Sequence, residues 1–379
     1  MAGKRTENLL SPQMFYLRMP TSEETMDQIF LDRNENQYGP APGCYEALRS
    51  ADLHGLSRYS RAYVRGTQGD LAERLSDELG IPEKQILLGY GSEDLLKQAV
   101  HCYLHAGETV LLPRQSWWYY HALAGEVSGR QEVYNLYERE GAFCFDADQI
   151  IALYERCAPA VILLASPNNP TGNSIAGREL LAVVRHCPTA AIILDQAYHG
   201  AAAAGRDNLR HLLESHNRLV VLRTFSKYYA LAGLRIGYAC VTPGSHRLTA
   251  YSARYLGYNR LSERIALAAL DDPLYYRTIQ ERMDEDKAGL ERLFTAWSGF
   301  VPFQSDANFL LVRYPAQNRR LLQEGLRLQG IAVKFLDEPG LESCMRISLG
   351  TRDQNSRLMD AIREIVEPQP IGSGVASRS

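Results

Sequence analysis

Residues 219–241 have the sequence LVVLRTFSKYYALAGLRIGYACV, and this stretch decides the class of fold. It begins with the apolar run Leu219 to Leu222 and ends with a second apolar run, Ile236 to Val241. Neither run alternates polar with apolar residues, which is typical of strands that are covered on both faces. Between them lies Lys227, flanked by hydroxyl residues and followed by Arg235. The stretch therefore predicts a polar site at the end of a buried strand.

Similar apolar runs recur along the chain and alternate with segments of helical periodicity. The further predicted strands are Ile86 to Leu88, Thr109 to Leu112, Ala160 to Ala165 and Ala190 to Leu194. One predicted helix spans Asp70 to Leu79, and another follows Ser92, which we expect to act as its N-cap. Because strands alternate with helices, we predict an α/β domain with a mostly parallel sheet.

The pattern changes after Pro273. A long charged helix, from about Leu274 to Trp297, is expected to precede a smaller α+β unit. Its expected strands are 307–312, 331–333 and 345–348, and its expected helices are 319–329 and a last one from about 352. We therefore predict an N-terminal arm (1–45) that packs with the small domain, a large domain (46–272), a small domain (273–366) and a disordered tail (367–379).

Composition excludes several classes of function. The chain has 379 residues, of which 45% are hydrophobic and 22% charged, as in ordinary globular proteins. A net charge of -3 provides no basic surface for nucleic acid or for an anionic membrane. The 7 cysteines include no Cys-x-x-Cys pair, which argues against a disulfide framework or a zinc site. No run approaches the ~20 apolar residues of a membrane span, and the N-terminus lacks a signal-peptide core, so we predict a cytoplasmic protein.

Four polar motifs fall where elements end. Ser166 to Gly172 (SPNNPTG) is either a plain turn or a rigid turn that presents an amide to a ligand. Asp195 ends a buried strand, where its carboxylate either caps the next turn or pairs with a group such as a pyridinium nitrogen. Gly91 to Glu93 begin a helix, whose free N–H groups suit a phosphate. Lys227 is either a solvated loop lysine or an amine that condenses with an aldehyde, while nearby hydroxyls and Arg235 hold a phosphate.

Taken together, the motifs resemble those of fold-type I pyridoxal phosphate enzymes, specifically the histidinol-phosphate aminotransferase-like group. The resemblance runs from about Phe30 to Val366 and includes LDRNENQYGP (residues 31–40), which is similar to the family's Asn-Glu-Asn-Pro-Tyr-Gly-Pro. It implies the fold-type I architecture, with a mostly parallel mixed sheet between helices and a smaller α+β domain. It also implies bound pyridoxal 5'-phosphate, a homodimer with shared active sites, and transfer of an amino group between an amino acid and a 2-oxo acid.

The resemblance assigns roles to individual residues. Lys227 is implied to bind the cofactor covalently and to move the proton between the substrate Cα and the cofactor. Asp195 is implied to pair with the pyridine nitrogen, and Asn169 and Tyr198 to hydrogen-bond the phenolic oxygen. Trp117 takes the position of the ring-stacking residue.

Two further sets of residues follow from the resemblance. The implied phosphate ligands are Gly91, Ser92, Glu93, Thr224, Ser226 and Arg235, together with Tyr59 from the partner subunit. The implied substrate contacts are Asn34, Glu35, Tyr38, Asn169, Lys334 and Arg346. Of these, Arg346 resembles the arginine that binds the acidic group of the substrate, for which a planar guanidinium is suited.

Three departures from the family pattern concern the substrate. Trp117 replaces a tyrosine, and the aromatic residues 118–120 that follow it suit core packing. The segment Arg61 to Gly69 is longer than the family's short loop and is expected near the mouth of the site. Lys334 replaces an arginine and is followed by Asp337 and Glu338, which disfavour a phosphorylated substrate. We therefore expect an unphosphorylated, basic or polar amino acid as substrate.

Other functions stay open at this point. The same residues can serve decarboxylation, β- or γ-elimination or cyclisation of an amino acid. A non-catalytic amino-acid sensor is a second class, although an intact Lys227 argues against it. His101 and His105 lie on one helical face, as a metal pair would, but no third ligand accompanies them, so we expect no metal site. Gly89-x-Gly91 lacks the third glycine of a dinucleotide fingerprint.

Overall fold

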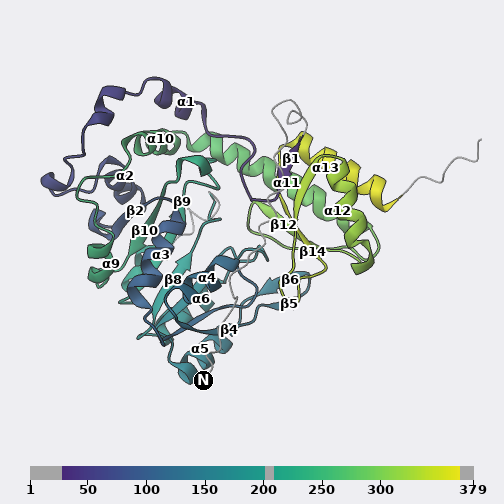
Figure 1. The fold of residues 1–379 in the computed structure, drawn as a ribbon, viewed down its shortest axis with the longest axis horizontal. Helices are drawn as coiled ribbons and strands as arrows, with labels where there is room; N and C mark the ends of the chain where they lie inside the picture. The colour runs from purple at the N-terminus through teal and green to yellow at the C-terminus, as the bar shows by residue number, and fades with distance from the viewer. Residues whose placement is uncertain (1–27, 201–208, 368–379) are drawn as a thin grey trace, which may run out of the picture.

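The structure is a computed structural model that describes residues 28–200 and 209–367. The predicted arm up to residue 27 and the predicted tail from residue 368 lie outside the described residues. Two units built on separate sheets lie side by side, and the long helix α11 (Pro273–Ala296) runs from the larger unit into the smaller one (Figure 1). Among the described residues, no helix is both long and apolar enough to cross a membrane.

The larger unit is built on a seven-stranded sheet with the strand order β2-β10-β9-β8-β7-β3-β4. Its strands are β2 (Ile86–Gly89), β3 (Thr109–Pro113), β4 (Arg130–Tyr134), β7 (Val161–Ala165), β8 (Ala191–Asp195), β9 (Leu219–Thr224) and β10 (Gly237–Val241). Strand β10 is antiparallel to both of its neighbours, and the other pairs are parallel. The predicted α/β fold with a mostly parallel mixed sheet is therefore confirmed.

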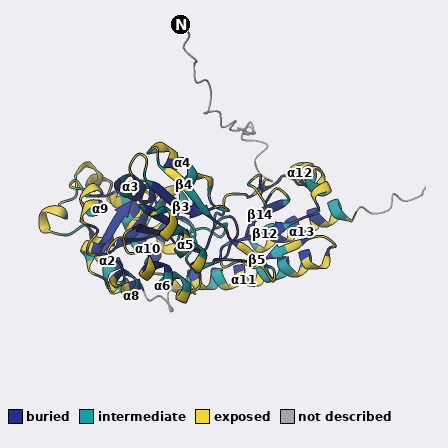
Figure 2. Cartoon of the chain, turned by 90° about the horizontal axis from the view of Figure 1, so that it is seen from below, coloured by how far each residue is buried: buried dark blue, intermediate teal, exposed yellow. Residues whose placement is uncertain are grey.

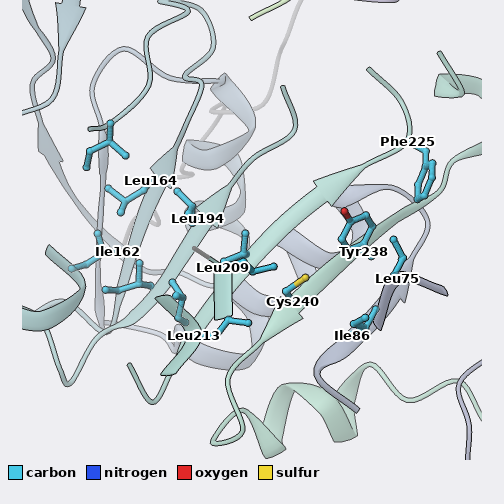
Figure 3. Packing of buried hydrophobic residues seen from close by; sticks show 14 of the residues in the cluster. Leu75, Ile86, Ile162, Leu164, Leu194, Leu209, Leu213, Phe225, Tyr238 and Cys240 are labelled. Carbon is cyan, nitrogen blue, oxygen red and sulfur yellow. The ribbon is translucent and has the colours of Figure 1, made fainter. Parts of the chain in front are cut away.

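Helices cover this sheet on both faces. They are α1 (Pro42–Arg49), α2 (Asp70–Leu79), α3 (Ser92–Tyr103), α4 (Trp118–Glu126), α5 (Ala147–Cys157), α6 (Gly177–His186), α8 (Leu209–Glu214), α9 (His246–Tyr251) and α10 (Arg260–Leu270). Short 3-10 turns are η2 (Leu53–Ser57), η3 (Tyr63–Arg65), η4 (Glu83–Gln85) and η5 (Ala232–Leu234). Alternate strand residues enter two hydrophobic clusters: Leu164 and Leu194 belong to one (Figure 3), and Leu163 and Ile193 to the other. Burial on both faces is why the strands lack a polar alternation.

In the larger unit, one expected helix cap differs from the structure and one strand of the sheet was not predicted. Ser92 is the first residue of α3, not its cap; Gly91 is the N-cap, with φ 85°, and no side chain caps the helix. A glycine adopts that backbone conformation readily, and its use leaves the first N–H groups of α3 open to a ligand. Strand β4 was not predicted because it lies at the sheet edge, where four of its five residues are only partly buried or exposed.

The smaller unit is built on a five-stranded sheet with the order β1-β13-β14-β12-β11. Its strands are β1 (Ile29–Leu31), β11 (Val301–Phe303), β12 (Phe309–Arg313), β13 (Ile331–Phe335) and β14 (Cys344–Ser348). The remaining elements are η6 (Ala316–Asn318), α12 (Arg319–Leu328) and α13 (Arg352–Val366). Strand β1 pairs in parallel with β13, so a segment near the N-terminus completes a sheet built from the C-terminal third. The exact domain boundaries stay a prediction.

A hairpin of the larger unit, β5 (Tyr137–Arg139) and β6 (Ala142–Cys144), contacts the smaller sheet. Arg313 on β12 donates two hydrogen bonds to Glu138, at 3.1 and 2.7 Å, and the rings of Phe143 and Phe303 lie 4.8 Å apart. In each unit, the exposed residues lie on the outside and the buried residues lie inside, where the helices pack on the sheet (Figure 2). These contacts fix the smaller sheet beside the strand ends that carry the polar motifs.

Gly237 provides a test of how closely α3 packs on the sheet. A Cβ at this position would lie 2.6 Å from the backbone nitrogen of Ser92 and 2.8 Å from the carbonyl oxygen of Arg223. We expect Gly237→Ala to lower the free energy of unfolding by about 1–3 kcal/mol, measured by urea denaturation, because the backbone must move apart. Gly125→Ala is the control, since nothing lies within 4 Å of its Cβ position. Equal stability of the two variants would contradict this packing.

Candidate active site

The polar motifs meet at the carboxyl ends of three adjacent parallel strands. Ala165 at the end of β7 pairs in register with Asp195 at the end of β8, and Asp195 pairs with Leu222 near the end of β9. The turn Ser166–Gly172 follows β7, and Lys227 follows β9. Parallel pairing therefore brings three of the four motifs to one edge of the sheet.

Asp195 is a buried carboxylate, 7% exposed, with two hydrogen-bond donors. The hydroxyl of Tyr120 donates to Oδ2 at 2.8 Å, and the backbone N–H of Ala197 donates to Oδ1 at 3.0 Å. Burial raises the pKa of Asp195, and these two hydrogen bonds act in the opposite direction. The carboxylate thus caps the following turn and still has lone pairs to accept a further N–H, such as that of a protonated pyridine ring.

Lys227 is a partly buried amine, not a solvated one. Its Nζ donates to the carbonyl oxygen of Arg33 at 2.8 Å and lies 5.6 Å from the centre of the Tyr198 ring. The pKa of Lys227 is lowered to about 8, mainly by burial and secondly by the positive charge of Arg346. The negative charge of Glu35 acts in the opposite direction. Near neutral pH a fraction of this amine is therefore in the nucleophilic, neutral form.

Tyr198 is held by residues of the smaller unit and of the segment before α1. Its hydroxyl accepts a hydrogen bond from Nδ2 of Asn34 at 2.9 Å, and its ring meets Phe309 edge-on at 5.1 Å. Asn34 is itself 1% exposed and is bonded to the Ser348 hydroxyl through its N–H (2.7 Å) and its Oδ1 (3.2 Å). The structure therefore places Asn34 as a support for Tyr198, and its predicted contact with substrate stays a prediction.

Arg346 lies on β14 and joins the site to the turn after β7. Its guanidinium donates to Oδ1 of Asn169 and to the carbonyl oxygen of Asp32, and it lies 5.5 Å from the centre of the Phe309 ring. Among the residues that the structure describes, its buried Nε has no hydrogen-bond partner. Burial lowers the pKa of Arg346. An unpaired N–H on a buried cation favours an anionic ligand, such as a substrate carboxylate.

The predicted phosphate residues form a cradle at the N-terminus of α3. Arg235 donates to Glu93 Oε2 at 3.3 Å and to Ser226 Oγ at 3.4 Å, and Thr224 Oγ1 donates to Ser226 Oγ at 2.9 Å. Gly91 has φ 85°, and a Cβ there would lie 2.7 Å from the Arg235 guanidinium. Free helix N–H groups, two hydroxyls and a guanidinium together provide an anion site.

These residues fit pyridoxal 5'-phosphate group by group. Lys227 offers the amine for its aldehyde, Asp195 the acceptor for its ring nitrogen, and the cradle of Arg235 the donors for its phosphate. Trp117 is half-buried and packs on Tyr119 and Tyr120, with ring centres 4.9 and 5.9 Å apart. Its stacking role stays a prediction.

The aromatic run after Trp117 divides between core and surface. Tyr120 is 3% exposed, lies in the core and bonds Asp195, whereas Trp118 is 64% exposed. The suggestion of core packing is therefore wrong for Trp118. A purely packing role also underestimates Tyr120, a site residue that sequence reasoning missed because a buried tyrosine gives no sign of its hydroxyl's partner.

Three predicted substrate residues lie at different distances from this centre. Glu35 is half-buried and its charge acts on Lys227. Lys334 is exposed on β13 and pairs in register with Arg346 on β14, so both side chains leave the sheet on the same face. Tyr38 instead packs against the core of the smaller unit. Burial raises the pKa of Tyr38, and the negative charge of Asp286 raises it further.

Two other predicted features lie on the periphery. Tyr59 is 70% exposed in the loop between η2 and η3, as a residue that reaches a partner subunit would be. The long segment Arg61–Gly69 includes η3 and lines part of an open pocket of about 550 Å³ beside α10. His101 bonds Glu126 at 3.0 Å and His105 bonds Arg247 at 3.2 Å, so the two imidazoles have separate partners. In the described ranges, no group of three potential ligands forms a metal site.

The lowered pKa of Lys227 predicts a pH dependence. Only the neutral amine attacks an aldehyde, so we expect adduct formation at Lys227 with pyridoxal to rise as the pH increases through about 8. Arg346→Gln removes a positive charge that favours the neutral amine, so the midpoint moves upward, while Arg346→Lys moves it less. Borohydride trapping and mass spectrometry of the cofactor-free protein measure the midpoint. An unchanged midpoint in Arg346→Gln would show that the two cations are not coupled.

Comparisons with known proteins agree with this geometry. The family described as "Aminotransferase class I and II" matches residues 26–362. The histidinol-phosphate aminotransferase of Roseiflexus castenholzii is 31% identical over 340 residues, which cover 89% of each chain. That of Ruminiclostridium cellulolyticum is 30% identical, over 89% of this chain and 92% of its own.

A solved structure is also similar throughout. The histidinol-phosphate aminotransferase of Sinorhizobium meliloti, in complex with pyridoxal-5'-phosphate, superposes with a TM-score of 0.78 at 27% identity. The match covers 89% of this chain and 90% of that one. The chain therefore belongs to the class I and II aminotransferases, pyridoxal phosphate enzymes of fold type I.

Proposed function

We propose that this enzyme transfers an amino group between an unphosphorylated amino acid, basic or polar, and a 2-oxo acid. The observation that carries the proposal is the pairing of Lys334 with Arg346 across β13 and β14. This places an ammonium group on the face of the sheet where the resemblance expects a second guanidinium. An ammonium is a strongly hydrated point charge and lacks the bidentate geometry that suits a phosphate.

The charges around Lys334 support the same conclusion. Asp337 is held by Arg319, whereas the negative charge of Glu338 acts on Arg346. A phosphate dianion bound here would lie in the field of Glu338 and also near Glu35, whose charge reaches Lys227. A carboxylate on Arg346 with a neutral polar side chain beyond it meets no such repulsion, and a cationic side chain would be attracted by Glu338 and Glu35 if it lay away from Lys334.

The chemistry follows from the roles of the residues. When bound, pyridoxal phosphate supplies an electron sink that stabilises negative charge on the substrate Cα. Asp195 keeps the ring nitrogen protonated, Tyr198 and Asn169 hydrogen-bond the phenolic oxygen, and Arg346 fixes the substrate carboxylate. Lys227, with its lowered pKa, takes and returns the proton at Cα. The proposal also includes a homodimer, in which Tyr59 of one copy reaches the cofactor phosphate bound by the other copy. It places the enzyme in the cytoplasm.

A donor screen tests the function. Holoenzyme is incubated with single amino acids or with histidinol phosphate, each with a 2-oxo acid, and the products are identified by mass spectrometry. We expect transamination of unphosphorylated donors; products that have lost carbon dioxide or a β-substituent would instead indicate lyase chemistry. Lys227→Ala is expected to abolish turnover, because it removes the amine that we propose to bind the cofactor and to move the proton at Cα. Efficient turnover of histidinol phosphate would overturn the proposed substrate class.

Lys334→Arg tests the basis of that choice. The new guanidinium offers a planar pair of donors, so we expect kcat/KM for histidinol phosphate to rise about tenfold relative to an unphosphorylated donor. Lys84→Arg, at an exposed position of η4, is the matched control and leaves the ratio unchanged. A ratio that does not respond to Lys334→Arg would mean that Lys334 does not face the substrate.

A further inference from the structure

The segment between α9 and α10 packs against the backbone of the phosphate cradle. Within it, Tyr258 is buried, 7% exposed, and its hydroxyl lies 2.6 Å from the carbonyl oxygen of Gly89 and 2.9 Å from that of Arg235. These two carbonyls belong to the two halves of the cradle: the turn before α3, and the residue that carries the guanidinium. A single hydroxyl thus contacts both halves at once.

Arg254 of the same segment holds the first half at further points. Its Nε donates to the carbonyl oxygen of Leu88 at 3.2 Å, and its guanidinium pairs with Asp94 at 2.7 Å. The same Asp94 oxygen accepts the N–H of Tyr90 at 2.9 Å. Arg254 also lies 4.7 Å from the centre of the Tyr90 ring, which in turn stacks on Tyr258 with ring centres 5.0 Å apart.

The cradle needs such support because its backbone is strained. Arg235 has φ 50°, in the left-handed region that residues with a side chain rarely adopt. A conformation of this kind persists only where the surrounding structure fixes it. The Arg235 side chain is 47% exposed, and its guanidinium contacts with Glu93, Ser226 and the carbonyl oxygen of Ala232 are long, at 3.3, 3.4 and 3.3 Å. Its direction is therefore set largely through its backbone, whose carbonyl Tyr258 holds.

We propose that Tyr258 and Arg254 are positioning residues for the cofactor phosphate. Neither is expected to touch the phosphate; Tyr258 keeps Arg235 in its strained conformation, and Arg254 holds the turn that presents the N-terminus of α3. Their contribution is made to the phosphate alone, since their contacts are with the cradle and not with Lys227 or Asp195. The inference does not depend on which amino acid the enzyme uses.

Tyr258→Phe removes the hydroxyl and retains the ring that stacks on Tyr90. Titration of the cofactor-free full-length protein, followed by absorbance, gives the Kd for pyridoxal phosphate and for pyridoxal, which lacks the phosphate. We expect the Kd for pyridoxal phosphate to rise about tenfold, as for loss of a hydrogen bond that orients a charged group, while the Kd for pyridoxal stays the same. Tyr251→Phe, whose ring is 59% exposed on α9, is the control and changes neither value.

The two ligands separate positioning from a general structural role. Equal weakening of both ligands, or no change in either, would overturn the proposal. Arg254→Lys provides a second variant, because lysine can still pair with Asp94 but loses the bond to Leu88 and the stacking on Tyr90. Thermal melting identifies a variant that does not fold, and the other then carries the test. Selective loss of pyridoxal phosphate binding in a folded variant supports the proposal.

Discussion

Asp195 ends β8 with its carboxylate almost wholly excluded from solvent, and the rest of the cofactor site is arranged around this buried charge. A buried carboxylate is stable only with donors around it, and Tyr120 and Ala197 provide two. Their geometry leaves acceptor capacity for a third donor. A protonated pyridine nitrogen would satisfy that need, and in the proposed site the carboxylate would in return keep the ring protonated and electron-withdrawing.

The charged groups on the other side of the site are the cations Lys227 and Arg346. Lys227 and Arg346 are both largely desolvated. The burial of Lys227, and then the positive charge of Arg346, make a proton on Lys227 unfavourable. A substrate carboxylate bound to Arg346 would offset the guanidinium charge, and would so remove one of the causes that lower the pKa of Lys227. The smaller sheet takes part in this tuning because it carries Arg346 on β14.

The meeting of the polar motifs at one edge of the sheet was predictable from sequence, because these motifs are short and contiguous and lie at the ends of apolar strands. Asp195, Lys227 and Arg235 could be placed in this way, and parallel pairing of β7, β8 and β9 brings the strand ends together. The supporting contacts could not be predicted. Asn34 and Ser348 are 314 residues apart in sequence, and Tyr258 meets Gly89 across 169 residues. Long-range hydrogen bonds of this kind leave no local pattern in the chain.

The residues that we propose to contact the substrate are positioned by strand pairing in the smaller unit. Two of the proposed substrate contacts, Lys334 and Arg346, come from the sheet of the smaller unit. Strand register puts Lys334 beside Arg346, so the spacing of the two cations is set by the β13–β14 pairing and not by a loop. A change from arginine to lysine at such a position keeps the charge and the fold but loses the planar donor pair. In the proposed function, this one side chain on a rigid sheet would alter the anion that is recognised and would leave the chemistry at Lys227 the same.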